Sequence, residues 1–160
     1  MPANVLIGNI FDAKEKYIVH QCNCVTNKAA HLSFDIFSRY PYANIYKGRE
    51  GRDKPGSIIV KGNGKDERYV INLLGQIYPG KPKYPIDDAK ARKGFFFSGL
   101  QEIAKIKELE SVAFPWGIGC GAAGGDWDFY HHLINKFADF IQIPVIIYKL
   151  GEWHGRGTRR

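Results

Sequence analysis

A glycine-rich stretch between Phe114 and Trp127 contains the residues best suited to hold a charged group. It joins an apolar run at residues 111–114 to an amphipathic helical pattern that opens near Asp126. Glycines let backbone N–H groups come close to an anion, and the start of a helix adds a favourable dipole. The stretch is therefore predicted to be a phosphate-binding loop; the alternative is a tight turn between a strand and a helix.

The spacing Gly119-x-Gly121-x-x-Gly124 in this stretch also satisfies the dinucleotide-binding pattern. That pattern usually lies in the first strand–loop–helix unit and is followed by an acidic residue at the end of the next strand. Here it lies late in the chain, and residues 145–149 contain no acidic residue. A nucleotide-dependent oxidoreductase is therefore the last-ranked interpretation of the loop.

Side chains near the predicted helix starts are candidates for acid–base chemistry. Asp126 opens the last helical pattern, where it is either a general base or a helix N-cap. His31 opens the first helical pattern; imidazole titrates in the range that suits proton transfer, and the alternative is a surface histidine. Lys28 either pairs with a terminal phosphate or is solvated, and His20 is expected to pack within a strand.

The composition is that of an ordinary globular domain, and 160 residues are enough to bury a core. The three cysteines have neither disulfide nor zinc spacing, so we expect small packing residues in a reduced intracellular protein, cytoplasmic or nuclear. No apolar run has the length of a signal peptide core or a membrane span, so no membrane partner is expected. The net charge of +7 favours an anionic partner, such as a nucleotide.

Hydrophobic periodicity predicts the elements that position these residues. Apolar runs predict strands at residues 4–7, 17–22, 57–61, 68–74, 111–114 and 145–148. Apolar stripes predict helices from residue 31 to about 40, from a cap at Asp87 or Asp88 to about 108, and from 127 to 141. This alternation predicts an α/β fold with a central, mostly parallel sheet and helices on both sides. One domain is expected over residues 1–150, followed by a solvated basic tail at 151–160, which with the basic surface allows a weak nucleic-acid contact.

Two of the predicted loops, at residues 21–30 and 117–125, each follow a strand and precede a helix. In a parallel sheet both loops open on the edge formed by the carboxyl ends of the strands, where ligands bind. One ligand is therefore expected to touch both loops.

Three motifs in these positions resemble the macrodomain family. They are Ile7-Gly8-Asn9-Ile10-Phe11 after the first strand, His20-Gln21-Cys22-Asn23-Cys24 after the second, and the run from Gly117 to Trp127 after the fifth. The likeness covers roughly residues 5–150 and is greatest to the compact branch of ADP-ribose 1''-phosphate phosphatases and small ADP-ribosyl hydrolases. It implies a three-layer α/β/α fold with a mixed, mostly parallel six-stranded sheet and a cleft for ADP-ribose.

The resemblance also implies roles for individual residues. Asn9, with backbone groups of Ile10 and Phe11, would contact adenine, and Asn23 would contact the distal ribose unless it only caps its own loop. The loop from Trp116 to Ala122 would cradle the diphosphate. The expected ligand-binding set is Asn9, Ile10, Phe11, Asn23, Thr26, Lys28, Trp116, Gly117, Ile118, Gly119, Cys120, Gly121 and Ala122, and the catalytic candidates are Asp126, His31 and Asn23.

The sequence departs from the family pattern in two places. Residues 25–33 contain no glycine, although family members usually have a glycine-rich loop there. Gly75-Gln76 and Ala122-Ala123 stand about where the lysine-dependent hydrolases need their Lys and Asp, so that mechanism is rejected. We expect a hydrolase acting on ADP-ribose 1''-phosphate or on ADP-ribosylated protein or nucleic acid, without cofactor or metal; the alternative is a non-catalytic ADP-ribose reader.

Overall fold

The computed structural model describes residues 1–151, which form a six-stranded sheet in the order β1-β6-β5-β2-β4-β3. The strands are β1 (Asn4–Ile7), β2 (Tyr17–Cys22), β3 (Ile58–Lys61), β4 (Tyr69–Leu74), β5 (Val112–Pro115) and β6 (Val145–Lys149). Every neighbouring pair is parallel except β3 with β4, so the predicted mixed, mostly parallel sheet is confirmed. The predicted basic tail lies outside the described residues from position 152 onward.

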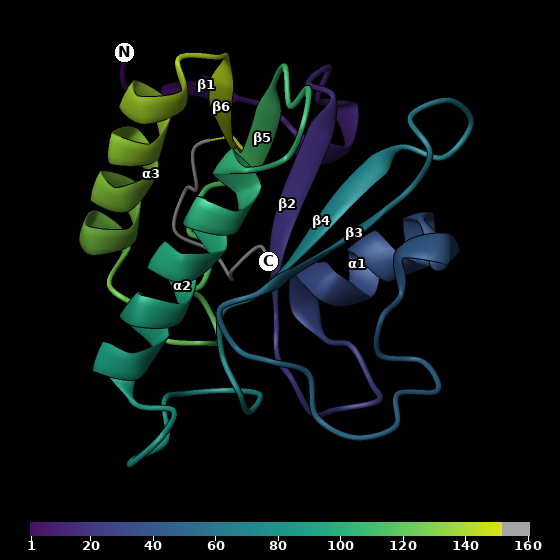
Figure 1. Ribbon diagram of the computed structural model, residues 1–160, viewed down its shortest axis with the longest axis vertical. Helices are drawn as coiled ribbons and strands as arrows, with labels where there is room; N and C mark the ends of the chain where they lie inside the picture. The colour runs from purple at the N-terminus through teal and green to yellow at the C-terminus, as the bar shows by residue number, and fades with distance from the viewer. Residues whose placement is uncertain (152–160) are drawn as a thin grey trace.

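Helices cover both faces of the sheet. α2 (Ala89–Ala104) and α3 (Trp127–Ile141) pack on one face, and α1 (His31–Arg39) packs on the other (Figure 1). The first core contains Phe96 of α2 and Tyr130 of α3, and the second contains Ile36 of α1; all three side chains are fully buried or nearly so. The three-layer α/β/α arrangement is thereby confirmed.

Most predicted boundaries hold to within one residue, but α2 ends earlier than its apolar pattern predicts. It ends at Ala104 rather than near residue 108. The N–H groups of Lys105 and Ile106 donate to carbonyls three residues back, which tightens the last turn. Glu108 then has φ +58°, a left-handed conformation that cannot continue a helix. The segment after α1 begins with a short 3₁₀ turn, η2 (Pro41–Ala43).

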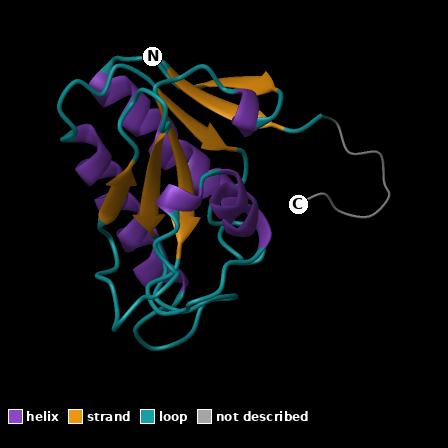
Figure 2. Ribbon diagram, turned by 90° about the vertical axis from the view of Figure 1, so that its right-hand side faces the viewer, coloured by secondary structure: helices purple, strands orange, loops and turns teal. Residues whose placement is uncertain are grey.

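The register of the sheet brings three loops to one edge. Cys22, the last residue of β2, pairs with Leu74, the last residue of β4. β5 lies on the other side of β2 and also runs parallel to it, with Ile18 opposite Ala113. The loops that follow β2, β4 and β5 therefore emerge together, and Figure 2 shows them gathered beyond the strand tips.

Candidate functional site

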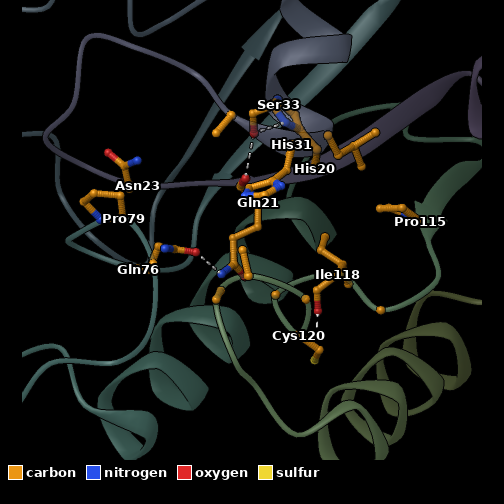
Figure 3. Close-up of a pocket in the computed structure, with 18 of the residues that line it drawn as sticks. His20, Gln21, Asn23, His31, Ser33, Gln76, Pro79, Pro115, Ile118 and Cys120 are labelled. Carbon is orange, nitrogen blue, oxygen red and sulfur yellow. Dashed lines mark hydrogen bonds between the residues drawn. The ribbon is translucent and has the colours of Figure 1, made fainter. Parts of the chain in front are cut away.

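A cavity of about 490 Å³ lies at this edge of the sheet (Figure 3). Its walls come from the loop after β2 and the first turn of α1, from the loop after β4, and from the glycine-rich loop after β5. A volume of this size is typical of small-molecule sites. The lining residues are His20, Gln21, Asn23, Lys28, Ala30, His31, Leu32, Ser33, Tyr46, Gln76, Pro79, Gly80, Pro115, Trp116, Gly117, Ile118, Gly119, Cys120, Gly121, Ala122, Ala123 and Trp127.

The glycine-rich loop presents its backbone to the cavity. Gly117 and Gly119 have φ +78° and +75°, a conformation open to glycine at little cost. The N–H groups of Gly119, Gly121 and Ala122 make no backbone hydrogen bond within the described residues. A side chain at Gly119 would collide with Gln21 and Tyr130, whereas one at Gly121 would meet nothing within 4 Å. The loop thus offers free N–H donors on a packed support, which suits an anion.

Asn23 is largely committed to its own loop. Its Oδ1 accepts hydrogen bonds from the N–H groups of Val25 and Thr26, at 3.0 and 2.9 Å, and its Nδ2 donates to the Thr26 hydroxyl. The Arg49 guanidinium donates to the carbonyl oxygens of Asn23 and Thr26 and fixes the loop from outside. Asn23 thus caps its own loop and also lines the cavity.

His31 and Lys28 both line the cavity, His31 from the start of α1 and Lys28 from the loop before it. His31 has φ +56°, which is uncommon for a residue with a side chain and places the imidazole at the start of α1. The N-cap of this helix, Ala30, makes no side-chain cap, so the first N–H groups of α1 are left for another acceptor. Non-glycine residues in this conformation are enriched at functional sites because strain there needs a compensating role.

The residues expected to contact adenine do not line this cavity. Asn9 caps the short 3₁₀ helix η1 (Ile10–Asp12), where its Oδ1 accepts from the Phe11 N–H at 2.9 Å. Ile10 is buried and Phe11 half-buried. Their neighbourhood is close to the end of β6, since the Gly8 N–H donates to the Lys149 carbonyl. Thr26 of the expected binding set also lies outside the cavity lining, and the seven residues from Trp116 to Ala122 all lie within it.

Asp126 is the N-cap of α3, with its Oδ1 accepting from the Asp128 N–H at 3.1 Å. It is exposed and is not among the residues that line the cavity. Burial raises the pKa of the neighbouring Cys120 thiol to about 12, and the Asp126 charge adds to this effect. Cys120 is therefore a protonated, weakly reactive thiol at neutral pH, which agrees with the expected packing role.

Two glutamines that were not predicted as site residues line the cavity and are hydrogen-bonded to each other. Gln21 Nε2 donates to Gln76 Oε1 at 2.7 Å (Figure 3). Gln76 Nε2 in turn donates to the Tyr78 carbonyl. The Gln21 side chain fills the space between Gly75 and Gly119, where an added Cβ would lie 2.4 and 2.7 Å from its Oε1. Their positions directly at the ends of β2 and β4 are the signal that would have identified them.

A buried ion pair holds the loop after β4 against the glycine-rich loop. Arg92 of α2 donates to Asp87 at 2.7 Å and also to the carbonyls of Gly80 and Ala123. Burial opposes ionisation of Asp87, but hydrogen bonds from Arg92 and from two backbone N–H groups outweigh it, so its pKa lies below the ordinary value. Arg92 therefore ties together two of the three loops that form the cavity.

Within residues 1–151, no group of three or more His, Cys, Asp or Glu side chains is arranged to hold a metal ion. No helix in that range is long and apolar enough to cross a membrane.

An α/β/α sandwich with a ligand-sized cavity at the carboxyl ends of parallel strands defines the structural class, and solved structures identify the fold. The macrodomain of Mycobacterium tuberculosis DarG superposes with a TM-score of 0.71 at 22% identity, over 91% of this chain and 97% of that one. A protein of unknown function from Bacteroides thetaiotaomicron gives 0.72 at 25%, over 94% and 99%. Thermosipho africanus DarTG, solved in complex with ADP-ribose, gives 0.72 at 16%, over 91% of this chain and 41% of that one.

The chain thus has the macrodomain fold, as its motifs predicted. No protein-family model and no curated protein sequence matches it. At these sequence identities the superpositions establish the fold but not the branch of the macrodomain family.

Proposed function

We propose that this protein binds ADP-ribose in the cavity and hydrolyses an ADP-ribose derivative there. The observation that carries the proposal is the loop from Trp116 to Ala122, which lines the cavity with the free N–H groups of Gly119, Gly121 and Ala122; the uncapped start of α1 lines it as well. Backbone N–H groups in such a loop and at a helix start both favour a bound anion such as a diphosphate. The ADP-ribose complex of a structure with the same fold supports this choice of ligand.

In the proposed complex the diphosphate rests on the glycine-rich loop. The adenine then lies toward Trp116, whose ring is tilted by 54° against that of Trp127 at a centroid distance of 4.9 Å, and toward Asn9 and the segment that follows it. The distal ribose lies toward Asn23, Lys28 and His31. Lys28 and His31 line the cavity, and in the proposed complex a terminal phosphate or a leaving group contacts them.

The proposed reaction is hydrolysis at the distal ribose, either of ADP-ribose 1''-phosphate or of an ADP-ribosyl bond to protein or nucleic acid. His31 is favoured over Asp126 as the proton-transfer group, because His31 lines the cavity while Asp126 caps α3 outside it. Hydrolysis through a covalent lysine is not proposed, since the cavity floor beyond β4 carries Gln76. A non-catalytic reader is the second candidate, favoured by the commitment of Asn23 to its own loop.

Binding is tested first, by thermal denaturation with ADP-ribose. At a hundredfold excess over the dissociation constant, a ligand that binds only the folded state stabilises it by about 2.7 kcal/mol. For a domain of this size the melting temperature should rise by roughly 5–10 °C. If millimolar ADP-ribose leaves the melting temperature unchanged, the proposal is refuted.

Turnover is tested next, by phosphate release from ADP-ribose 1''-phosphate and by ADP-ribose release from modified protein and DNA. His31→Ala should abolish turnover while ADP-ribose still binds, and Asp126→Asn should leave it nearly unchanged. His132→Ala on the exposed side of α3 is the matched control. Binding without turnover on any of these substrates in the unmutated protein would establish the reader instead.

A further inference from the structure

A chain of buried polar side chains runs from the centre of the sheet to the wall of the cavity. Asn72 on β4 and His20 on β2 are both buried, and they meet through Asn72 Oδ1 and His20 Nε2 at 2.6 Å. The other ring nitrogen, His20 Nδ1, lies 3.0 Å from the Ser33 hydroxyl on α1 (Figure 3). Ser33 lines the cavity, so the chain ends at the ligand site.

The donor and the acceptor of the hydrogen bond between Asn72 and His20 can be assigned from the other contacts of Asn72. Asn72 Nδ2 donates to the carbonyls of Ala43 and Ile59, so its Oδ1 must be the atom that faces His20. An amide oxygen only accepts, and His20 Nε2 must therefore carry the proton. Burial lowers the pKa of His20 to about 4, so the ring is neutral at physiological pH and its Nδ1 is a bare acceptor.

The Ser33 hydroxyl has one proton and two acceptors on the protein side. These are His20 Nδ1 at 3.0 Å and the Gln21 carbonyl oxygen at 3.2 Å. Either one draws the proton inward, away from the cavity. The other donor near Nδ1 is the Cys22 thiol at 3.9 Å, which is a weak donor, so the Ser33 hydroxyl is the better partner for Nδ1. The Ser33 oxygen consequently turns its lone pairs toward the ligand.

We propose that Ser33 is a directional acceptor for a hydroxyl group of the distal ribose, and that His20 and Asn72 are the positioning residues that fix its direction. The proposal rests on the ADP-ribose binding proposed above. A lone pair repels phosphate oxygens, which instead find the N–H donors of the loop after β5. The Trp116–Trp127 pair provides the aromatic surface for the base, which leaves the hydroxyl-bearing sugar as the donor that Ser33 can select.

The test compares ADP-ribose with ADP, which lacks the distal ribose, by titration calorimetry. Ser33→Ala should weaken ADP-ribose binding roughly three- to tenfold, the worth of one hydrogen bond, and leave ADP binding unchanged. Ser33→Thr retains a hydroxyl and should retain most of the affinity for ADP-ribose. Equal losses for both ligands, or no loss for either, would overturn the assignment of Ser33 while leaving ADP-ribose binding intact.

Two further outcomes keep this test separate from the proposed function. If the unmutated protein binds neither ligand, the proposed function fails and the role of Ser33 fails with it. The second measurement is the tautomer of His20, read from its ring nitrogens by ¹⁵N NMR in the unmutated protein. A proton on Nε2 supports the direction given above, and a proton on Nδ1 would overturn it even if Ser33→Ala failed to fold.

Discussion

Gly121 and Gly119 lie two residues apart in the same loop, but a side chain at each should have opposite consequences. Gly119 has φ +75°, and an added Cβ would lie 2.7 Å from Gln21 Oε1 and 2.8 Å from the Tyr130 ring. Gly121 lacks a positive φ, has no atom within 4 Å of its added Cβ, and borders the cavity. A side chain at Gly119 therefore strains the protein, and one at Gly121 occupies ligand space.

The magnitudes follow from these two environments. At Gly119, a left-handed conformation costs an alanine about 1–2 kcal/mol and the overpacking adds about 1–3 kcal/mol. Unfolding should therefore become easier by roughly 2–5 kcal/mol, and the melting temperature should fall by roughly 4–20 °C. At Gly121, alanine should change the free energy of unfolding by no more than about 0.5 kcal/mol. Gly121→Val, which projects further, should weaken ADP-ribose binding at least about tenfold if it removes one or two loop contacts.

Differential scanning calorimetry and isothermal titration with ADP-ribose measure the two effects separately. Gly94→Ala is the matched control, because Gly94 on α2 also has an unobstructed Cβ position and lies away from the cavity. It should leave the affinity unchanged. If Gly121→Val binds ADP-ribose as tightly as the unmutated protein, the glycine-rich loop does not hold the diphosphate and the reasoning is refuted.

Four more predictions concern the Arg92–Asp87 pair, His31 and Cys120. Arg92→Met leaves the buried Asp87 without its partner and should destabilise the protein by about 3–5 kcal/mol. Because the pKa of Asp87 is lowered on folding, the contribution of Asp87 to stability is present above about pH 4 and is lost as the pH falls further. Asp87→Asn should therefore make the melting temperature less dependent on pH in the acid range. His31→Gly should relieve the φ of +56° and raise the melting temperature by a few degrees, while turnover falls; a lower melting temperature would contradict the strain. Cys120, with its pKa raised to about 12, should resist iodoacetamide at pH 8, and rapid alkylation followed by mass spectrometry would contradict that pKa.

The fold could be predicted because its signals are local. In α3, Tyr130, Ile134 and Phe137 recur at helical spacing and are buried on one face, so periodicity located the helix correctly. Strands separated by helices require parallel pairing, and parallel pairing brings the loops after β2 and β5 to the same edge. The order of the strands and the early end of α2 depend on contacts between distant segments. The left-handed Glu108 that follows α2 has no such local pattern.

Some residues of the candidate site can be recognised from the sequence around them, whereas others acquire their role only when two strands pair. Glycines that present N–H groups can be recognised from the sequence alone, and the loop from Trp116 to Ala122 does line the cavity. His20 was correctly expected to pack within its strand, but its link to Ser33 depends on Asn72, which is 52 residues away and lies opposite His20 only because β2 and β4 pair in register.

Because β2 and β4 pair in this register, Asn72, His20 and Ser33 form a hydrogen-bonded chain with a fixed order of donors and acceptors. The carbonyls of Ala43 and Ile59 orient Asn72, and Asn72 selects the protonated nitrogen of His20. The Ser33 hydroxyl then donates inward, to His20 Nδ1 or to the Gln21 carbonyl. The polarity that the ligand meets at Ser33 is thus determined by backbone carbonyls of η2 and β3, which do not line the cavity. Both Ser33 and His20 line the cavity, so Ser33→Ala tests the ligand contact, and the tautomer of His20 tests the order of donors and acceptors behind it.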